Sequence, residues 1–335
     1  MKRRLLFGTA ISISLLVLVF RQLDLSQVSD TIRSISYLPL IAAGITLSLT
    51  LVIRSWRWRY LFEPVKKARM SNLLSATSIG ASMDMLLPAR SGDVIRAYVI
   101  GRKEQTSKIA SLSTIVVEKV LDILVLLVIA FVTIAVISFS KDRLSLPSGF
   151  SVAVFLLVGV IPIVIALLWF LMANTEKVDW IMRAILAFLP ERILSRLSDT
   201  LISVAQGLQV LRQRESLVRI IILSILLWSL FALGNLLVLH SFGLHLPVYA
   251  SFLILVFQIL GVTLPSSPGF IGTYHAAVIA GLAVFGISQE LALSVAIVMH
   301  ITFFLPFIMI GLFFLWKENL SAQDIWSANA EAERA

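Results

Sequence analysis

Long apolar runs recur through the whole chain and limit its fold more than any other feature of the sequence. A membrane-crossing helix needs roughly 20 apolar residues, or fewer where the bilayer thins. Hydrophobic residues make up 59% of the 335 residues and charged residues only 14%, whereas an average soluble domain carries roughly 25% charged residues. The sequence therefore predicts an all-α polytopic membrane protein. Its six predicted full spans are residues 5–20, 37–53, 112–139, 151–173, 217–240 and 291–316.

Two further apolar stretches are interrupted by proline and glycine. Residues 71–100 break at Leu87-Pro-Ala-Arg-Ser-Gly-Asp93, and residues 247–287 break at Leu264-Pro-Ser-Ser-Pro-Gly-Phe-Ile-Gly272. The spacing from the first proline to the following glycine is the same in both. We expect each stretch to form a broken, re-entrant helical hairpin, because freed backbone groups at membrane depth need a protein or water-filled surrounding. The predicted break residues are Pro88, Gly92, Pro265, Pro268, Gly269 and Gly272.

Basic residues set the predicted orientation, because cytoplasmic loops carry an excess of Lys and Arg. We place the N-terminus in the cytoplasm and let each broken stretch enter and leave on one side. Lys119 then lies within a span, and 23 of the 28 Lys and Arg residues face the cytoplasm. The strongest determinant is the cluster Arg54, Arg57, Arg59, Lys66, Lys67 and Arg69, and only Arg21, Arg33, Lys141 and Arg143 lie outside. Both termini are predicted to be cytoplasmic.

The two halves of the chain are predicted to form an inverted repeat. Each half has two spans, a broken hairpin and a third span, and the hairpins open to opposite sides, as is common among secondary transporters. Laying residues 108–118 on residues 290–300 pairs Glu118 with His300. The prediction is one transmembrane domain, residues 1–316, with halves of about 1–140 and 150–316, a cytoplasmic interfacial segment 174–216 and a short cytoplasmic tail 317–335.

Charged residues within one predicted span point to a polar site. A charge at the middle of a span costs about 2.5–3.5 kcal/mol on insertion scales, and it usually faces a cavity or a partner. Glu118 and Asp122 lie four residues apart on one helix face, and Lys119 can reach Asp122. Two interpretations are equally consistent with the acids: contact with a substrate, or an ion network that locks hairpin to helix.

The first break carries charges of its own. Arg90, Asp93 and Arg96 follow one another at intervals of three residues, and Asp84 precedes them. The planar guanidinium of arginine suits a phosphate, so anion contact is favoured for Arg90 and Arg96.

The four histidines and the absent cysteines limit the chemistry. His275 follows the second break, and His300 lies in the last span at a depth comparable to Glu118. No four-ligand zinc spacing and no cysteine occur, so no metal site, disulfide or thiolate chemistry is predicted. The sequence has no nucleophile–base signature and no phosphate-binding loop, so we predict neither a cofactor nor an enzymatic activity.

Three segments together resemble the flippase-like transmembrane domain family, which is the membrane region of lysylphosphatidylglycerol synthase and also occurs as a stand-alone protein. They are Leu86-Leu-Pro-Ala-Arg-Ser-Gly-Asp-Val-Ile-Arg-Ala-Tyr98, Val116-Val-Glu-Lys-Val-Leu-Asp122 and the second break. The resemblance covers about residues 5–316. Asp93 and Lys119 stand where the family usually has Glu and Arg. His275 and His300 replace a common Glu and a common Arg, so the charges of the second half are not kept.

The resemblance implies that the protein moves a phospholipid or a lipid-linked anionic headgroup of the polyprenyl-phosphate type across the cytoplasmic membrane. Arg90 and Arg96 would hold the phosphate, while Glu118, Lys119 and Asp122 would position them or engage a cationic group. With Asp93, His275 and His300, these residues form the predicted substrate site. The soluble lysyl-transferring domain of the synthase is absent from the sequence, so lysyl transfer is not implied.

Two alternatives stay open. The protein could be a membrane-embedded lipid-modifying enzyme, or a non-catalytic membrane scaffold for a lipid-biosynthetic enzyme. The expected partners are membrane lipids with anionic headgroups and, in the scaffold alternative, that enzyme. Nucleic acid is not expected, because the basic residues behind the net charge of +9 are scattered between apolar runs.

Overall fold

The computed structural model describes residues 30–87, 91–139, 213–264 and 267–320, together with the single residues 152, 159, 162 and 166. Within these ranges every regular element is a helix, as predicted. Four helices are long and apolar enough to cross a membrane: α3 (Tyr37–Phe62), α6 (Lys108–Phe139), α10 (Arg214–Ser241) and α13 (Gln289–Lys317). They confirm four of the six predicted spans, and each is longer than predicted at one end or both.

The other two predicted spans cannot be compared in the same way. Residues 5–20 lie outside the described residues, and so do residues 151–173 apart from the four single positions. The predicted interfacial segment 174–216 is also outside them except at its end, where α10 already begins at Arg214.

The outward faces of the long helices are apolar. On α3, Ile41 and Ile45 are 61% and 67% exposed, and on α13, Leu305 and Met309 are 52% and 60% exposed. Water-soluble proteins rarely expose continuous apolar surface of this kind, whereas a lipid-facing helix exposes it because the surrounding lipid tails are themselves apolar. This pattern fits a multi-pass membrane protein.

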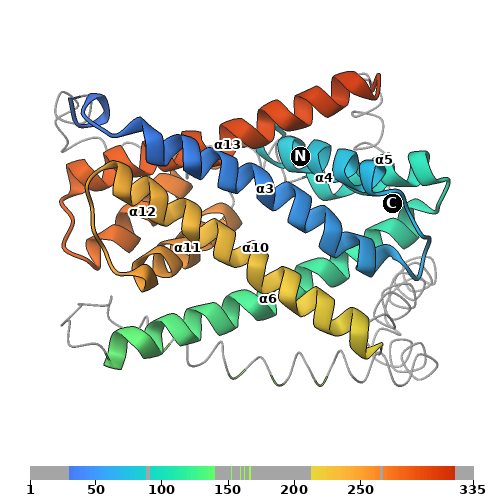
Figure 1. Cartoon of the computed structure of the whole chain (residues 1–335), viewed down its shortest axis with the longest axis horizontal. Coiled ribbons are helices and arrows are strands. Elements are labelled where there is room, and N and C mark those ends of the chain that lie inside the picture. Colours follow the sequence, from blue (N-terminus) through green and yellow to red (C-terminus); the bar gives the residue numbers. More distant parts are fainter. Residues whose placement is uncertain are drawn as a thin grey trace, which may run out of the picture.

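Helices α3 and α10 run side by side through the middle of the molecule (Figure 1). They are antiparallel, because the Ser36 N–H, just before α3, donates to the carbonyl of Ser241 at the end of α10 over 2.9 Å. Gly234 permits this close approach, since a Cβ there would lie 3.0 Å from the Leu47 side chain. Small residues commonly serve helix contacts in membranes in this way.

The first interrupted stretch folds as a hairpin of α4 (Met70–Leu86) and α5 (Gly92–Glu104). Gly92 begins α5 so close to α4 that a Cβ would lie 2.0 Å from the Gly80 carbonyl oxygen. The Asp84 carboxylate accepts the Gly92 N–H over 2.8 Å. The predicted interruption is therefore confirmed on both of its sides, while Pro88 and Arg90 lie outside the described residues.

The second interrupted stretch contains α11 (Val248–Thr263), the 3-10 helix η3 (Pro268–Phe270) and α12 (Thr273–Ala283). Gly269 and Gly272 have φ angles of 73° and 96°, a region that favours glycine. Gly261 packs against α12, since a Cβ there would lie 2.7 Å from the Ala277 side chain. Pro265 lies outside the described residues, but the interruption around it is confirmed.

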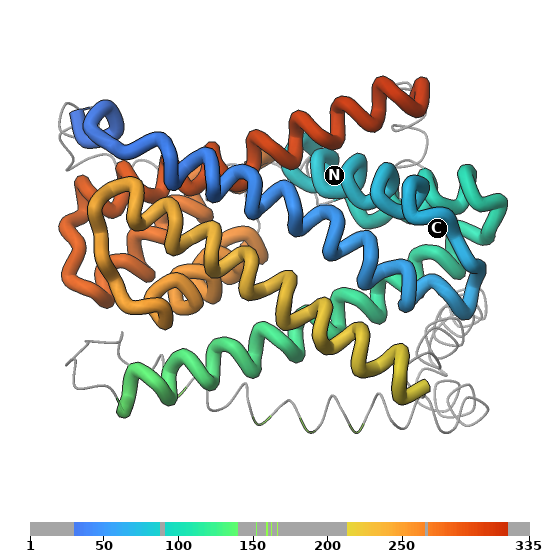
Figure 2. The backbone as a smooth tube through the Cα atoms, viewed as in Figure 1, coloured from blue at the N-terminus to red at the C-terminus, as the bar shows by residue number. Residues whose placement is uncertain are grey.

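The two hairpins enter the bundle from opposite ends. Glu318, directly after α13, pairs with Lys103 near the end of α5, so the open end of the first hairpin lies beside the end of α13. At the other end, Ile35 and Leu282 share one buried cluster with the last turns of α10. The interruptions meet between these ends, where η3 contacts α4. Figure 2 shows α4 and α5 at one side of the crossing long helices and α11 and α12 at the other.

Contacts in one half of the bundle have counterparts in the other. Helix α4 contacts α13, and α11 contacts α6; α5 contacts α6, and α12 contacts α13; α3 contacts α4, and α10 contacts α11. Gly311 lets α13 approach α4 closely, since a Cβ there would lie 2.2 Å from the Ser82 hydroxyl oxygen.

Candidate functional site

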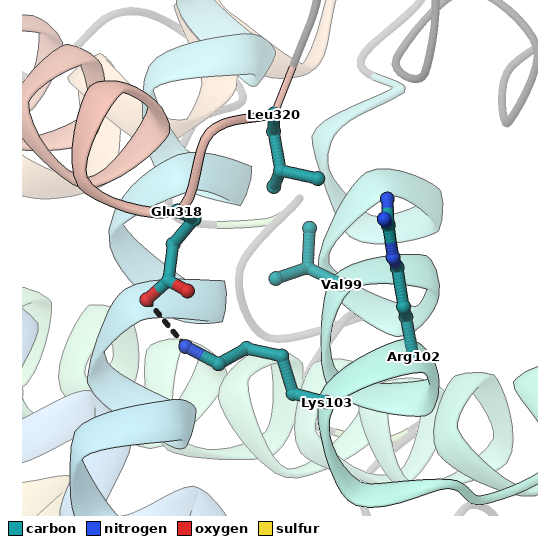
Figure 3. Close-up of a pocket in the computed structure, with 5 residues that line it drawn as sticks. All are labelled: Val99, Arg102, Lys103, Glu318 and Leu320. Carbon is teal, nitrogen blue, oxygen red and sulfur yellow. Dashed lines mark hydrogen bonds and ion pairs between the residues drawn. The ribbon is translucent and has the colours of Figure 1, made fainter.

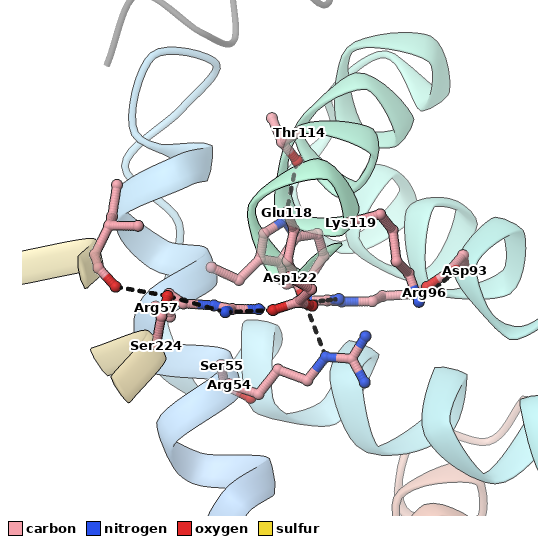
Figure 4. A network of polar contacts seen from close by, with 12 residues as sticks. Arg54, Ser55, Arg57, Asp93, Arg96, Thr114, Glu118, Lys119, Asp122 and Ser224 are labelled. Carbon is pink, nitrogen blue, oxygen red and sulfur yellow. Dashed lines mark hydrogen bonds and ion pairs between the residues drawn. The ribbon is translucent and has the colours of Figure 1, made fainter. Parts of the chain in front are cut away.

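A buried carboxylate on α6 collects three arginines. Glu118 is completely buried, and Arg54 Nε of α3 donates to its Oε1 atom over 2.8 Å. Arg96 of α5 donates from Nη1 to the same oxygen over 3.1 Å and places Nη2 at 2.9 Å from Oε2. Arg57, one turn after Arg54, brings Nη2 to 3.3 Å from Oε1. Figure 4 shows these side chains converging from three helices.

Asp122 adds a second carboxylate to this cluster, and its partner Arg57 reaches a fourth helix. Asp122 lies one turn beyond Glu118 on the same face of α6, and it accepts a hydrogen bond from Arg57 Nη1 over 2.6 Å. The same Nη1 donates to the Ser224 hydroxyl of α10 over 3.1 Å (Figure 4). We call Arg54, Arg57, Arg96, Glu118 and Asp122 the charged centre. Through it, α3, α5, α6 and α10 are joined by charge-assisted hydrogen bonds, which are stronger than neutral ones.

Trp58 supports the charged centre from within α3. The Arg96 guanidinium carbon lies 3.7 Å from the centre of the Trp58 ring, a distance at which a cation is attracted to the ring face. The Trp58 indole N–H donates to the Thr114 hydroxyl of α6 over 2.9 Å. Trp58 therefore fixes the Arg96 side chain and at the same time ties α3 to α6.

A second ion pair lies at the edge of the charged centre. Lys119 Nζ is 2.9 Å from Asp93 Oδ2, and the two side chains are 35% and 27% exposed. We expected Lys119 to reach Asp122 along its own helix. It pairs with α5 instead, because Asp122 is already engaged by Arg57. Five of the predicted site residues are thus brought together: Asp93, Arg96, Glu118, Lys119 and Asp122.

The predicted histidines come together at the second interruption. The rings of His275 and His300 are 4.8 Å apart. His300 Nε2 donates to the Gly269 carbonyl over 2.8 Å, and the Gly272 N–H donates to His275 Nδ1 over 3.4 Å. Tyr274 directly precedes His275 in the sequence and packs against His300 with a ring distance of 5.2 Å. Both imidazoles are held by the glycines that shape the break.

An uncharged polar network continues from these histidines. Gln258 of α11 donates to the Tyr274 hydroxyl over 2.9 Å and exchanges hydrogen bonds with Asn235 of α10 at 2.9 and 3.0 Å. All three side chains are buried. The polar groups around the second break thus carry no formal charge while the histidines are neutral, in contrast to the charged centre beside the first.

Sequence reasoning missed Arg54 and Arg57 as site residues. We ended the span at residue 53 and counted both arginines among the cytoplasmic charges, but α3 continues to Phe62 and carries them into the core. The signal was present in the run Trp56, Trp58, Tyr60, Leu61 and Phe62, whose bulky apolar side chains continue the helix between the basic residues. Arg90, also predicted for the site, lies outside the described residues.

A pocket of about 250 Å³ lies at the end of the molecule where α5 and α13 finish. It is lined by Val99, Arg102, Lys103, Glu318 and Leu320, and the Lys103–Glu318 ion pair lies at its wall (Figure 3). None of the residues that line this pocket belongs to the charged centre.

Glu318 joins three elements at this pocket. Its carboxylate also accepts a hydrogen bond from the Ser75 hydroxyl of α4 over 3.0 Å. Burial alone would raise its pKa, but the hydrogen bonds from Lys103 and Ser75 and the charges of Lys103 and Lys317 outweigh burial and hold the pKa of the Glu318 carboxyl below its ordinary value.

Comparison with known proteins identifies the family. The family model of the lysylphosphatidylglycerol synthase TM region matches residues 5–311, which confirms the resemblance seen in the sequence. No curated protein matches the chain. The matched region contains the whole charged centre, both interruptions, all of α3, α6 and α10, and α13 as far as residue 311. This multi-pass helical membrane protein therefore belongs to the family of the lysylphosphatidylglycerol synthase TM region, which links it to lipid metabolism.

Proposed function

We propose that the protein moves a phospholipid or a lipid-linked anionic headgroup, such as a polyprenyl phosphate, between the leaflets of the cell membrane. The observation that carries this proposal is the charged centre, in which three arginines surround Glu118 beside the first helix interruption. Ionisable groups inside a membrane region are expensive to bury and commonly belong to a transport path. Membership of a family linked to lipid metabolism supports a lipid as the cargo.

The architecture that we propose for this transport is an inverted repeat with two re-entrant hairpins and cytoplasmic termini. It is supported by the opposite directions from which the hairpins enter and by the corresponding contacts of the two halves. Transporters built in this way bind their cargo where broken helices meet near the middle of the membrane. The contact between η3 and α4 is where such a site would lie.

The predicted site residues take roles on this path. Asp93, Arg96, Glu118, Lys119 and Asp122 serve the half with the charged centre. Arg90 serves the same half by its place in the sequence. His275 and His300 serve the other half, where their contact with Gly269 and Gly272 supports the role. We propose no chemical conversion of the lipid, and no cofactor.

Leaflet exchange of labelled lipids tests the proposal. Purified protein is reconstituted into vesicles with fluorescent phosphatidylglycerol, phosphatidylcholine or polyprenyl phosphate in trace amounts, and a membrane-impermeant reductant bleaches the label of the outer leaflet. We expect protein-dependent exchange of at least one anionic lipid above the rate in protein-free vesicles. No gain for any lipid would contradict translocation.

One observation favours a different function, a non-catalytic scaffold for a lipid-biosynthetic enzyme. Glu118 is fully buried and Arg96 is 2% exposed. In a scaffold, the role of this ion pair would be to hold α5 against α6. A scaffold would show no leaflet exchange but would retain its fold and its membrane insertion. The exchange assay and a thermal unfolding curve together separate the two functions.

A further inference from the structure

The charged centre contains one more positive than negative charge. Arg54, Arg57 and Arg96 contribute three positive charges, and Glu118 and Asp122 contribute two negative ones. The neighbouring ion pair of Lys119 and Asp93 is neutral overall and does not change this difference. Leaving a buried charge without a partner is strongly destabilising. An additional anion is therefore expected at the charged centre.

Only one arginine of the charged centre is open to such an anion. The side chains of Arg57 and Arg96 are 0% and 2% exposed, whereas that of Arg54 is 24% exposed. Arg54 uses only its Nε atom on Glu118. Its two terminal nitrogens point away from that carboxylate (Figure 4) and have no hydrogen-bond or ion-pair partner among the described residues.

We propose that the free end of Arg54 is a binding site for a singly charged phosphate group. The two terminal nitrogens of a guanidinium present parallel N–H groups that match two oxygens of one phosphate. One negative charge neutralises the charged centre, so a phosphodiester fits the charge balance better than a phosphomonoester, which carries about 1.5 to 2 negative charges at neutral pH.

The proposal assigns to Arg54 the contact that the sequence favoured for Arg96. The Arg96 guanidinium already packs on the Trp58 ring and contacts both carboxylate oxygens of Glu118. Arg96 therefore holds the carboxylate in place. The identification of the phosphate with a lipid headgroup rests on the proposed function. The existence of the anion site does not, because it follows from the charge difference and the exposure of Arg54.

Native mass spectrometry of the purified full chain tests the site through binding alone. The protein in detergent is titrated with phosphatidylglycerol, with phosphatidic acid and with zwitterionic phosphatidylcholine. The variants are Arg54→Gln, which keeps a donor for Glu118, and Arg59→Gln as the matched control, because Arg59 is an exposed arginine of the same helix. A thermal unfolding curve of each variant shows that it is folded.

We expect phosphatidylglycerol to bind tightest, and Arg54→Gln to weaken this binding by about 10-fold or more while Arg59→Gln leaves it unchanged. Equal binding by both variants, or equal binding of phosphatidylcholine and phosphatidylglycerol, would overturn the proposal. If Arg54→Gln fails to fold, Arg54→Lys replaces it. The affinity for phosphatidylglycerol is then also measured at high salt concentration, because salt weakens a contact between charges. An affinity that does not change with salt would overturn the proposal.

Inorganic phosphate serves as a second probe that separates the two sources of the group. Retention of phosphatidylglycerol in its presence supports a lipid headgroup as the ligand, and displacement supports a site for free phosphate. Failure of the inference is distinct from failure of the proposed function. If Arg54→Gln loses binding but the wild type shows no leaflet exchange, the phosphate site is supported and translocation is contradicted. If the wild type shows leaflet exchange but both variants bind phosphatidylglycerol equally, translocation is supported and the phosphate site is contradicted.

Discussion

Glu118 is the residue on which the charged centre depends most, because its carboxylate contacts all three guanidinium groups. Thr114, one turn earlier on α6, accepts the Trp58 indole N–H and ties this part of α6 to α3. Buried ion pairs contribute little net stability compared with apolar residues, but removing one partner is costly because the other charge stays buried. The consequences of mutation therefore depend on which charge is removed.

Replacing Glu118 by Gln is expected to destabilise the protein severely. The charged centre would change from one excess positive charge to two, and breaking a buried pair in this way lowers the free energy of unfolding by about 3–5 kcal/mol. The measurement is a denaturant or thermal unfolding curve in detergent. Glu63→Gln is the matched control, since Glu63 is exposed directly after α3. Equal stability of the two variants would contradict the electrostatic role of Glu118.

The sequence predicted part of the charged centre and could not predict the rest. Glu118 and Asp122 share a helix face at a spacing of four residues, so their common location followed from periodicity. The partners of Lys119 and Asp122 did not follow, because they come from α5 and α3, far away in the sequence. Helix periodicity carries no information on such long-range pairing, and the true end of α3 was needed to place Arg57.

At the scale of the helices, glycine sets how closely the hairpins pack. Gly80 and Gly92 let α4 and α5 touch along their backbones, and Gly261 does the same for α11 and α12. The sequence predicted both interruptions from proline and glycine. It did not predict η3 or its contact with α4, because a three-residue 3-10 turn leaves no periodic pattern to read.

Gly92→Ala is expected to destabilise the first hairpin. The new Cβ would lie 2.0 Å from the Gly80 carbonyl oxygen and 2.6 Å from Asp84, so the helices must separate, and overpacking of this kind costs about 1–3 kcal/mol or more. Gly44→Ala is the control, because nothing lies within 4 Å of its Cβ position and alanine favours the helix. Thermal unfolding should therefore rank Gly44→Ala at or above the wild type and Gly92→Ala below it; the opposite order would refute the packing argument.

The contact of Glu318 with Lys103 and Ser75 is expected to make stability depend on acid pH. Because the pKa of Glu318 is lowered in the folded protein, its contribution is complete above the ordinary glutamate pKa of about 4.3 and is lost as the pH falls through the lower folded value. Melting temperatures measured from pH 7 to pH 3 should fall less for Glu318→Gln than for the wild type. If the melting temperatures of the two proteins fall in parallel with pH, the Glu318 carboxylate does not stabilise the contact of α13 with α4 and α5.

At the scale of the whole molecule, the two halves share an arrangement of helices but differ in charge. The first hairpin adjoins a charged centre, and the second adjoins the neutral network of Asn235, Gln258 and Tyr274. Helix contacts correspond because both halves repeat the same order of long helix, hairpin and long helix. The sequence already showed histidines, His275 and His300, at the places where pairing of the two halves would put counterparts of the charged residues of the first half.

Accessibility of single cysteines tests the proposed topology. The chain contains no cysteine, so each variant carries one label. Lys67→Cys and Ser107→Cys flank the first hairpin, His245→Cys and Gln289→Cys flank the second, and all four positions are exposed. The first two should react with a membrane-impermeant maleimide only from the cytoplasmic side, and the last two only from outside. Labelling of all four from one side would contradict the inverted repeat.

A structure in lipid nanodiscs containing phosphatidylglycerol would show directly whether a lipid headgroup enters the charged centre. We expect lipid density whose phosphate lies within hydrogen-bond distance of the terminal nitrogens of Arg54, beside Glu118 and the interruption after α4. A side chain of the protein covering Arg54, with Glu118 and Asp122 satisfied entirely by neighbouring residues and no lipid between the hairpins, would contradict it.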